Sequence, residues 1–198
     1  MGEETQDGPV AEAASQRRLI VGLGNPGREY ERTRHNLGFR VVEALAARWG
    51  MSLDETLCNS RFARSSGVDL ALPQTFMNRS GFAVRCLKEH FEYVPSSVLV
   101  VYDEVAFPLG RLRLRAKGSP GGHRGMESVI ESLRTDEVPR LRVGVAPEDG
   151  EIDDLVRFVL EDFTATEEEL VEAVIERAAD ACDSWLKEGV TATMSQFN

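Results

Sequence analysis

The stretch that decides the fold lies near the N-terminus and reads LIVGLGNPG (residues 19–27). Its first three residues, Leu19, Ile20 and Val21, form a short apolar run that predicts a strand, and a glycine-rich turn follows directly. A second apolar run, residues 98–102, has no polar interruption, as expected of a parallel strand buried on both faces. Both runs are expected to be strands of one sheet.

The rest of the chain alternates between helical and strand patterns. Helical spacing of apolar residues covers residues 36–50, 80–91 and 126–133, and strand patterns cover residues 68–72, 111–115 and 140–145. This alternation predicts an α/β fold, with a single three-layer αβα domain over residues 17–198 and a mixed, mostly parallel twisted sheet.

A last long helix is expected near the C-terminus. It is predicted to begin at a capping box formed by Thr166 and Glu169, and to end at Gly189. The side chains expected on its inward face are Leu170, Val174, Ala178, Ala181 and Trp185.

The charge of the chain is unevenly distributed. The net charge is −10, but residues 1–16 hold four acids and no base, and residues 148–188 hold fifteen acids and three bases. The remainder is basic, and residues 105–124 contain five bases and no acid. A basic body with acidic appendages can still bind a polyanion. Residues 1–16 are predicted to be a disordered acidic tail.

Neither a leader nor a membrane span is expected, because no apolar stretch approaches the roughly 18–20 residues that a membrane helix needs. A cytoplasmic protein is therefore predicted. The three cysteines, Cys58, Cys86 and Cys182, are scattered and form no C-x-x-C pair. They fit a reducing compartment, with neither a disulfide framework nor a zinc site.

The glycine-rich turn after the first strand formally matches G-x-G-x-x-G, which can cradle a dinucleotide. Pro26 removes a backbone donor from it, and no helical pattern follows until residue 36. A tight structural turn, and a substrate loop that presents Asn25, are the other two interpretations.

A histidine and an acid stand at positions suited to acid–base chemistry. His35 lies just before the helix expected at residues 36–50, where the positive end of the helix favours a neutral ring that can act as a base. Asp103 follows the buried strand at residues 98–102, and Asn25 follows the first strand. Since ligands bind beyond the carboxyl ends of such strands, these side chains are expected to share one edge of the sheet. A structural histidine and a loop-capping carboxylate are the alternatives.

Two further loops precede helices. Asn78 lies between the strand at residues 68–72 and the helix at residues 80–91, where it can cap the helix or contact a substrate. The loop GSPGGHRG (residues 118–125) contains His123 and can bind an anion, act as a mobile gate or be a plain flexible connection.

In this order, the motifs resemble those of the bacterial-type peptidyl-tRNA hydrolase family. The resemblance runs from about Arg18 to Asn198. It is carried by GLGNPG (residues 22–27) with Tyr30, TRHN (33–36), TFMNRSG (75–81), DE (103–104), GGH (121–123) and RLRVG (140–144).

The resemblance implies an enzyme that hydrolyses the ester between peptide and tRNA, with His35 as the catalytic base and Asp103 orienting it. The substrate-binding residues that it implies are Asn25, Tyr30, Met77, Asn78, His123 and Arg124. It also implies that Arg115 and Arg142 clamp a tRNA phosphate, and the basic segment adds Arg111 and Lys117 as candidates for the tRNA backbone. No metal and no cofactor are expected, the partner is peptidyl-tRNA, and the protein is predicted to be a monomer.

One position departs from the family pattern. Arg124 stands where the family usually has an asparagine, and arginine offers donors but no acceptor. Two rival hypotheses follow: a non-catalytic RNA-binding relative of the same fold, and a nucleotide-dependent enzyme that uses the glycine-rich turn.

Overall fold

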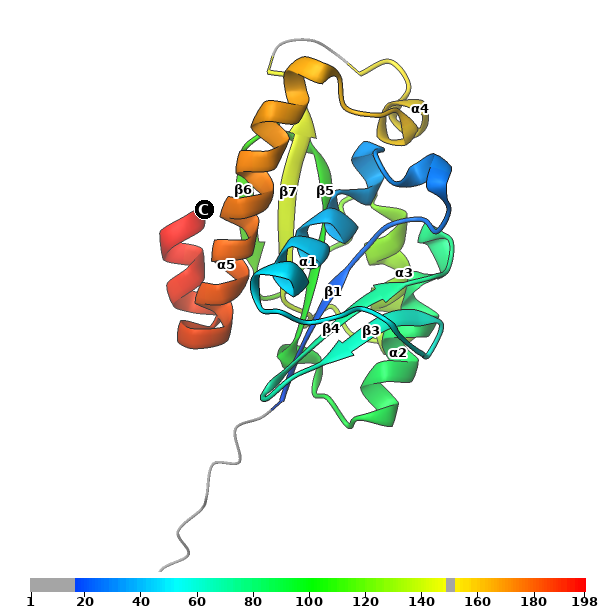
Figure 1. The fold of residues 1–198 in the computed structure, drawn as a ribbon, viewed down its shortest axis with the longest axis vertical. Coiled ribbons are helices and arrows are strands. Elements are labelled where there is room, and N and C mark those ends of the chain that lie inside the picture. Colours follow the sequence, from blue (N-terminus) through cyan, green and yellow to red (C-terminus); the bar gives the residue numbers. More distant parts are fainter. Residues whose placement is uncertain (1–16, 149–151) are drawn as a thin grey trace, which may run out of the picture.

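The described part of the chain forms a three-layer αβα domain, as predicted (Figure 1). The structure is a computed structural model that describes residues 17–148 and 152–198. The predicted tail, residues 1–16, lies outside the described residues. The described strands form a seven-stranded sheet in the order β2-β3-β4-β1-β5-β7-β6. The strands are β1 (Arg18–Gly22), β2 (Glu55–Leu57), β3 (Ser60–Arg64), β4 (Val68–Pro73), β5 (Val98–Pro108), β6 (Leu112–Arg115) and β7 (Arg140–Ala146).

The four central strands, β4, β1, β5 and β7, are parallel, and the strands outside them pair antiparallel. The sheet is therefore mixed with a parallel centre, as predicted. Helices α1 and α5 cover one face, and α2 and α3 cover the other (Figure 1). The helices are α1 (Leu37–Arg48), α2 (Ser80–His90), α3 (Arg124–Leu133), α4 (Leu155–Leu160) and α5 (Ala165–Phe197), with 3-10 turns η1 (Arg28–Tyr30), η2 (Arg34–Asn36), η3 (Met77–Arg79) and η4 (Pro95–Ser97).

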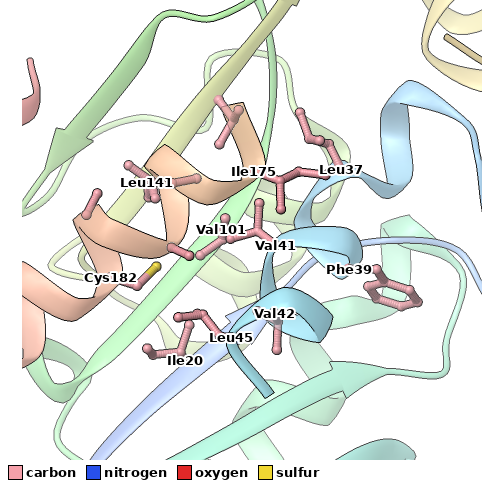
Figure 2. Packing of buried hydrophobic residues seen from close by; sticks show 14 of the residues in the cluster. Ile20, Leu37, Phe39, Val41, Val42, Leu45, Val101, Leu141, Ile175 and Cys182 are labelled. Atoms are coloured by element: carbon pink, nitrogen blue, oxygen red, sulfur yellow. The ribbon is translucent and has the colours of Figure 1, made fainter. Parts of the chain in front are cut away.

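Alternate side chains of the central strands enter two separate cores. Ile20 and Val101 pack with α1 and α5, in the cluster drawn in Figure 2, whereas Leu19, Val21 and Val100 pack with α2 and α3. Successive side chains of a strand point to opposite faces, so a continuous apolar run is what a strand covered on both sides requires. Each such side chain is fully buried, which stabilises the fold by about 1.5–3 kcal/mol per residue.

Two glycines let α1 lie directly on the sheet. A Cβ atom at Gly22 would lie 2.3 Å from the Gly38 carbonyl oxygen, and one at Gly38 would lie 2.3 Å from the Val101 carbonyl oxygen. Backbone therefore meets backbone at the start of α1. This contact holds the preceding turn, η2, over the ends of β1 and β5.

The C-terminal helix differs from its prediction in three ways. Its capping box joins Thr164 and Glu167, so the predicted pair was two residues too late. Leu170 is exposed, and Val171 is buried in its place with the other residues of the inward face. Gly189 breaks the helix at φ 82°, as predicted, but a second helical segment then folds back beside the first, as Figure 1 shows, and Ser184 Oγ meets Thr193 Oγ1 at 2.9 Å.

The prediction of no disulfide was wrong: Cys58 and Cys86 are joined in a disulfide, and Cys182 is free and buried. The two bonded cysteines are 28 residues apart, and only the hairpin of β2 and β3 brings the first beside α2. That hairpin and helix α4 were not predicted. None of the described helices has both the length and the apolarity needed to cross a membrane.

Candidate active site

The carboxyl ends of the parallel strands hold the candidate catalytic residues. Asn25 follows β1, Asp103 lies in β5, and η2 presents His35 directly before α1. All three line one cavity of about 400 Å³, which confirms the prediction that Asn25 and Asp103 share an edge of the sheet. A larger hollow of about 590 Å³ lies elsewhere, beside Arg18 and Trp185, and contains none of the predicted site residues.

His35 and Asp103 form a close pair. The Nδ1 atom of His35 lies 3.0 Å from both carboxylate oxygens of Asp103. The Asp103 side chain is 1% exposed, and the His35 side chain is 13% exposed. An ionised carboxylate can only accept hydrogen bonds, so Nδ1 is the donor and Nε2 of the neutral ring is left with a free lone pair. This is the tautomer that a general base needs.

The same carboxylate also binds His123. The Nε2 atom of His123 lies 3.0 Å from Asp103 Oδ1, and its Nδ1 accepts from the backbone N–H of Met126 at 3.2 Å. These two bonds assign the proton to Nε2, and they make His123 the N-cap of α3. Because both ring nitrogens are engaged, His123 is held against Asp103. That two histidines share this carboxylate was not predicted from the sequence.

The charge of Asp103 decides the ionisation of His35. Burial lowers the pKa of His35, but the negative charge and hydrogen bond of Asp103 outweigh it, so the pKa lies above its ordinary value. Burial alone would raise the pKa of Asp103, yet the two histidines hold it well below its usual range. The helix end alone, which favours a neutral ring, had predicted the opposite direction for the His35 pKa.

Asn25 is held rigidly by its neighbours. Asn36 accepts from the Asn25 backbone N–H at 2.8 Å and donates to its carbonyl oxygen at 2.9 Å. The side-chain oxygen of Asn25 accepts from the Met77 backbone N–H at 2.8 Å. These bonds leave the Nδ2 group of Asn25 as its donor toward the cavity. Asn36 was not predicted as a site residue, although its place in the TRHN motif is a signal that could have found it.

The other substrate-binding candidates divide into three groups. Met77 is buried beneath the cavity, and Asn78 is an exposed residue that lines it and does not cap α2. Arg124 lines the cavity as the first residue of α3, and its charge acts on His35 to lower the pKa of that ring. Tyr30 lies in η1, where its carbonyl oxygen accepts from the Thr33 hydroxyl, and it does not line the cavity.

An apolar wall completes the cavity and was missed from the sequence. Helix α4 contributes four apolar side chains, and Phe76 adds an exposed aromatic ring. The apolar run LVRFVL within an acidic region was the available signal. The α4 side chains in the wall are Leu155, Val156, Val159 and Leu160.

The predicted tRNA-binding cations differ in how exposed they are and in whether a carboxylate pairs with them. Arg115 lies half-buried on β6, and burial together with Arg113 and Arg142 lowers the pKa of its guanidinium. Arg142 is paired instead, with its Nε atom 2.7 Å from a carboxylate oxygen of Glu104. Lys117 is exposed, 3.5 Å from Glu137. Arg111 is exposed, and the Cζ atom of its guanidinium lies 5.2 Å from the centre of the Phe107 ring.

Three possible metal ligands also meet in the site. Ligand atoms of His35, Asp103 and His123 lie within 4.8 Å of one another. A histidine ligates a metal through an unprotonated ring nitrogen. Here the nitrogens that face Asp103 are hydrogen-bond donors, and the second nitrogen of His123 accepts from Met126. The arrangement therefore fits hydrogen-bonded acid–base chemistry better than metal binding.

Comparison with known proteins identifies close relatives. The family model described as "Peptidyl-tRNA hydrolase" matches residues 19–198. A peptidyl-tRNA hydrolase of Synechococcus sp. (strain JA-3-3Ab) is 48% identical, covering 96% of this chain and 85% of the relative. One from Chloroflexus aggregans is 45% identical, covering 91% and 98%. The crystal structure of peptidyl-tRNA hydrolase from Acinetobacter baumannii superposes with a TM-score of 0.84 at 33% identity, covering 93% of this chain and 95% of that one.

Proposed function

The chain belongs to the peptidyl-tRNA hydrolase family, and from this premise we propose how its site acts. The reaction is hydrolysis of the ester between a peptide and the 3′ ribose of tRNA, which releases the tRNA for reuse in translation. The proposal concerns the roles of the individual residues in that reaction.

His35 acts as the general base. Its Nε2 atom takes a proton from a water molecule in the cavity, and that water attacks the ester carbonyl. Asp103 stabilises the imidazolium that forms, since the carboxylate already raises the pKa of the ring. The attacking water makes a covalent enzyme intermediate unnecessary.

Asn25 supports the negative charge that develops on the carbonyl oxygen. Its side-chain oxygen is occupied by the Met77 N–H, so the amide cannot flip and its Nδ2 group points a fixed donor at the substrate. Asn78, at the exposed rim of the cavity, positions the substrate beside it. The apolar wall of α4 and Phe76 contacts the peptide.

The tRNA backbone is bound by cations outside the cavity. Arg115, Arg111 and Lys117 lie in the acid-free segment and contact phosphates without reading sequence. Arg142 is not free to swing toward a phosphate, because it is paired with Glu104. Its role is to place a second positive charge near Arg115. The protein works in the cytoplasm as a monomer and rescues tRNA from stalled translation, since ribosomes release its substrate there.

The two rivals have less support. The comparisons give no support to a non-catalytic RNA-binding relative. For a dinucleotide site, the glycine-rich turn lacks the α-helix that should follow at once, because η1 is only three residues long.

The observation that carries the proposal is the 3.0 Å contact of His35 with the buried Asp103. His35→Ala should lower kcat for peptidyl-tRNA by roughly 10²–10⁴-fold, the usual loss of a general base. His90→Ala is the matched control, because His90 is an exposed histidine on α2 away from the cavity. Wild-type turnover in folded His35→Ala protein would refute the role.

A further inference from the structure

The disulfide between Cys58 and Cys86 lies outside the active site and serves no step of the reaction. Cys58 is in the turn that joins β2 and β3, and Cys86 is on α2, with their Cα atoms 5.6 Å apart. Cys58 is half-buried and Cys86 is exposed, so a small reagent can reach the pair. The separation of the Cα atoms is within the range that a disulfide requires.

The covalent ring that this bond closes contains one side of the site. Between the two cysteines the chain forms β3, β4 and η3, so the ring includes Met77 and Asn78. A hydrogen bond of 2.7 Å from the Gln74 N–H to the Asn59 carbonyl oxygen ties the hairpin turn to the segment that leads into η3. His35 and Asp103 lie outside the ring.

We propose that Cys58 and Cys86 are a reversible redox site that clamps this segment when it is oxidised. A domain of this size with two apolar cores does not need a disulfide to fold. Accessible disulfides in reducing compartments are usually transient and respond to redox conditions. The pair is therefore a dithiol under reducing conditions and a disulfide under oxidising ones.

The oxidant is a low-molecular-weight disulfide such as oxidised glutathione. The exposed Cys86 thiolate attacks one sulfur of that disulfide, which forms a mixed disulfide and releases one glutathione thiolate. The Cys58 thiolate then displaces the second glutathione. The two protein thiols lose two protons and two electrons, and oxidised glutathione becomes two molecules of reduced glutathione.

Counting thiols tests the site directly, and the third cysteine provides an internal reference. Cys182 is fully buried, and burial raises the pKa of its thiol, so it should not react in the folded protein. Alkylation of the native protein should therefore label both thiols of the pair after dithiothreitol and neither after oxidised glutathione. Unfolding the oxidised protein without reductant should expose Cys182 alone. Two reactive thiols, or a persistent glutathione adduct, after oxidation would overturn the proposal.

Thermal unfolding tests the clamp. A bond that closes a ring of this length should raise the midpoint of the oxidised protein by roughly 5–15 °C over the reduced protein. Cys86→Ser should abolish the difference, and Cys182→Ala should keep it. Equal midpoints of the two wild-type forms would contradict the clamp.

Kinetics of the two forms test the link to the site. Reduction should raise KM for peptidyl-tRNA and leave kcat nearly unchanged, because the ring contains Met77 and Asn78 but not the base. A fall in kcat with KM unchanged would contradict this link. The thiol count does not depend on turnover, so it remains informative even if the residue roles proposed for the reaction are wrong.

Discussion

At the scale of single residues, the ionisation of His35 should determine the pH dependence of the enzyme. The neutral ring is the base, so kcat/KM should rise as pH increases through the His35 pKa. Asp103 raises that pKa, so the acid limb should lie at higher pH than an unperturbed histidine would give.

Asp103→Asn should move the acid limb of the kcat/KM profile to lower pH, because the charge that favours the imidazolium is gone. It should also lower kcat by roughly 10²-fold or more, because the imidazolium that forms in the reaction loses its partner. A pH–rate profile from pH 5 to 9 measures both effects. An acid limb at the wild-type position would show that Asp103 does not control the base.

Arg124 offers a second prediction at this scale. It lines the cavity, and its positive charge lowers the pKa of His35. Arg124→Asn should raise KM for peptidyl-tRNA, since a cation that attracts the substrate is lost, and leave kcat nearly unchanged. Arg134→Asn, an exposed position at the other end of α3, is the control for the same charge change. A fall in kcat of about 10²-fold would instead make Arg124 a catalytic group.

At the scale of elements, Arg34 connects η2, the turn that carries His35, to helix α4 of the apolar wall. Its guanidinium donates to the Asp162 carbonyl oxygen at 2.9 Å and to the Glu167 carboxylate at 2.8 Å. The Cζ atom of the guanidinium also lies over the Phe158 ring of α4, 4.3 Å from the ring centre. The side chain is 6% exposed, so these bonds replace water that the guanidinium has lost.

Arg34→Lys should lower the free energy of unfolding by about 2–3 kcal/mol, because an ammonium cannot reproduce the planar fork of donors. It should also raise KM for peptidyl-tRNA, because α4 loses its attachment to η2. Arg40→Lys is the matched control: Arg40 pairs with Glu168 nearer the surface and should cost at most about 1 kcal/mol. Equal destabilisation by the two variants, measured by chemical denaturation, would contradict this account.

At the scale of the whole molecule, charge is separated between the α5 region and the β5–β6 region. The acid-free segment around β6 is expected to attract tRNA, although the net charge of the chain is −10. Arg115→Ala should reduce the salt dependence of tRNA affinity by up to about one unit of log–log slope. Lys187→Ala, on the exposed face of α5, makes the same charge change and should leave the slope unchanged.

A minimal ester without the tRNA body separates binding from chemistry. Arg115→Ala should weaken hydrolysis of peptidyl-tRNA much more than hydrolysis of this ester. Arg142→Ala should lower the rate of hydrolysis of both substrates, because it leaves the nearly buried Glu104 carboxylate without its ion-pair partner. Equal losses on the two substrates for Arg115→Ala would assign that residue to the fold.

The sequence alone determined the features that rest on local periodicity and on ordered motifs. The strand at residues 98–102 was predictable because a strand covered on both faces is apolar throughout. Asn25 and Asp103 were placed on one edge because each was expected to follow a parallel strand, although β5 continues past Asp103 to Pro108. The family was evident because its motifs occur in order along nearly the whole chain.

Only the tertiary structure decided which distant groups meet. Nothing in the spacing shows that His123 shares Asp103 with His35, that α4 forms the apolar wall, or that Cys58 meets Cys86. Each contact joins segments through the packing of intervening strands and helices, which local patterns do not encode. The direction of the His35 pKa shift was decided in the same way, because the field at a buried ring comes from every charge folded around it and not from its own helix alone.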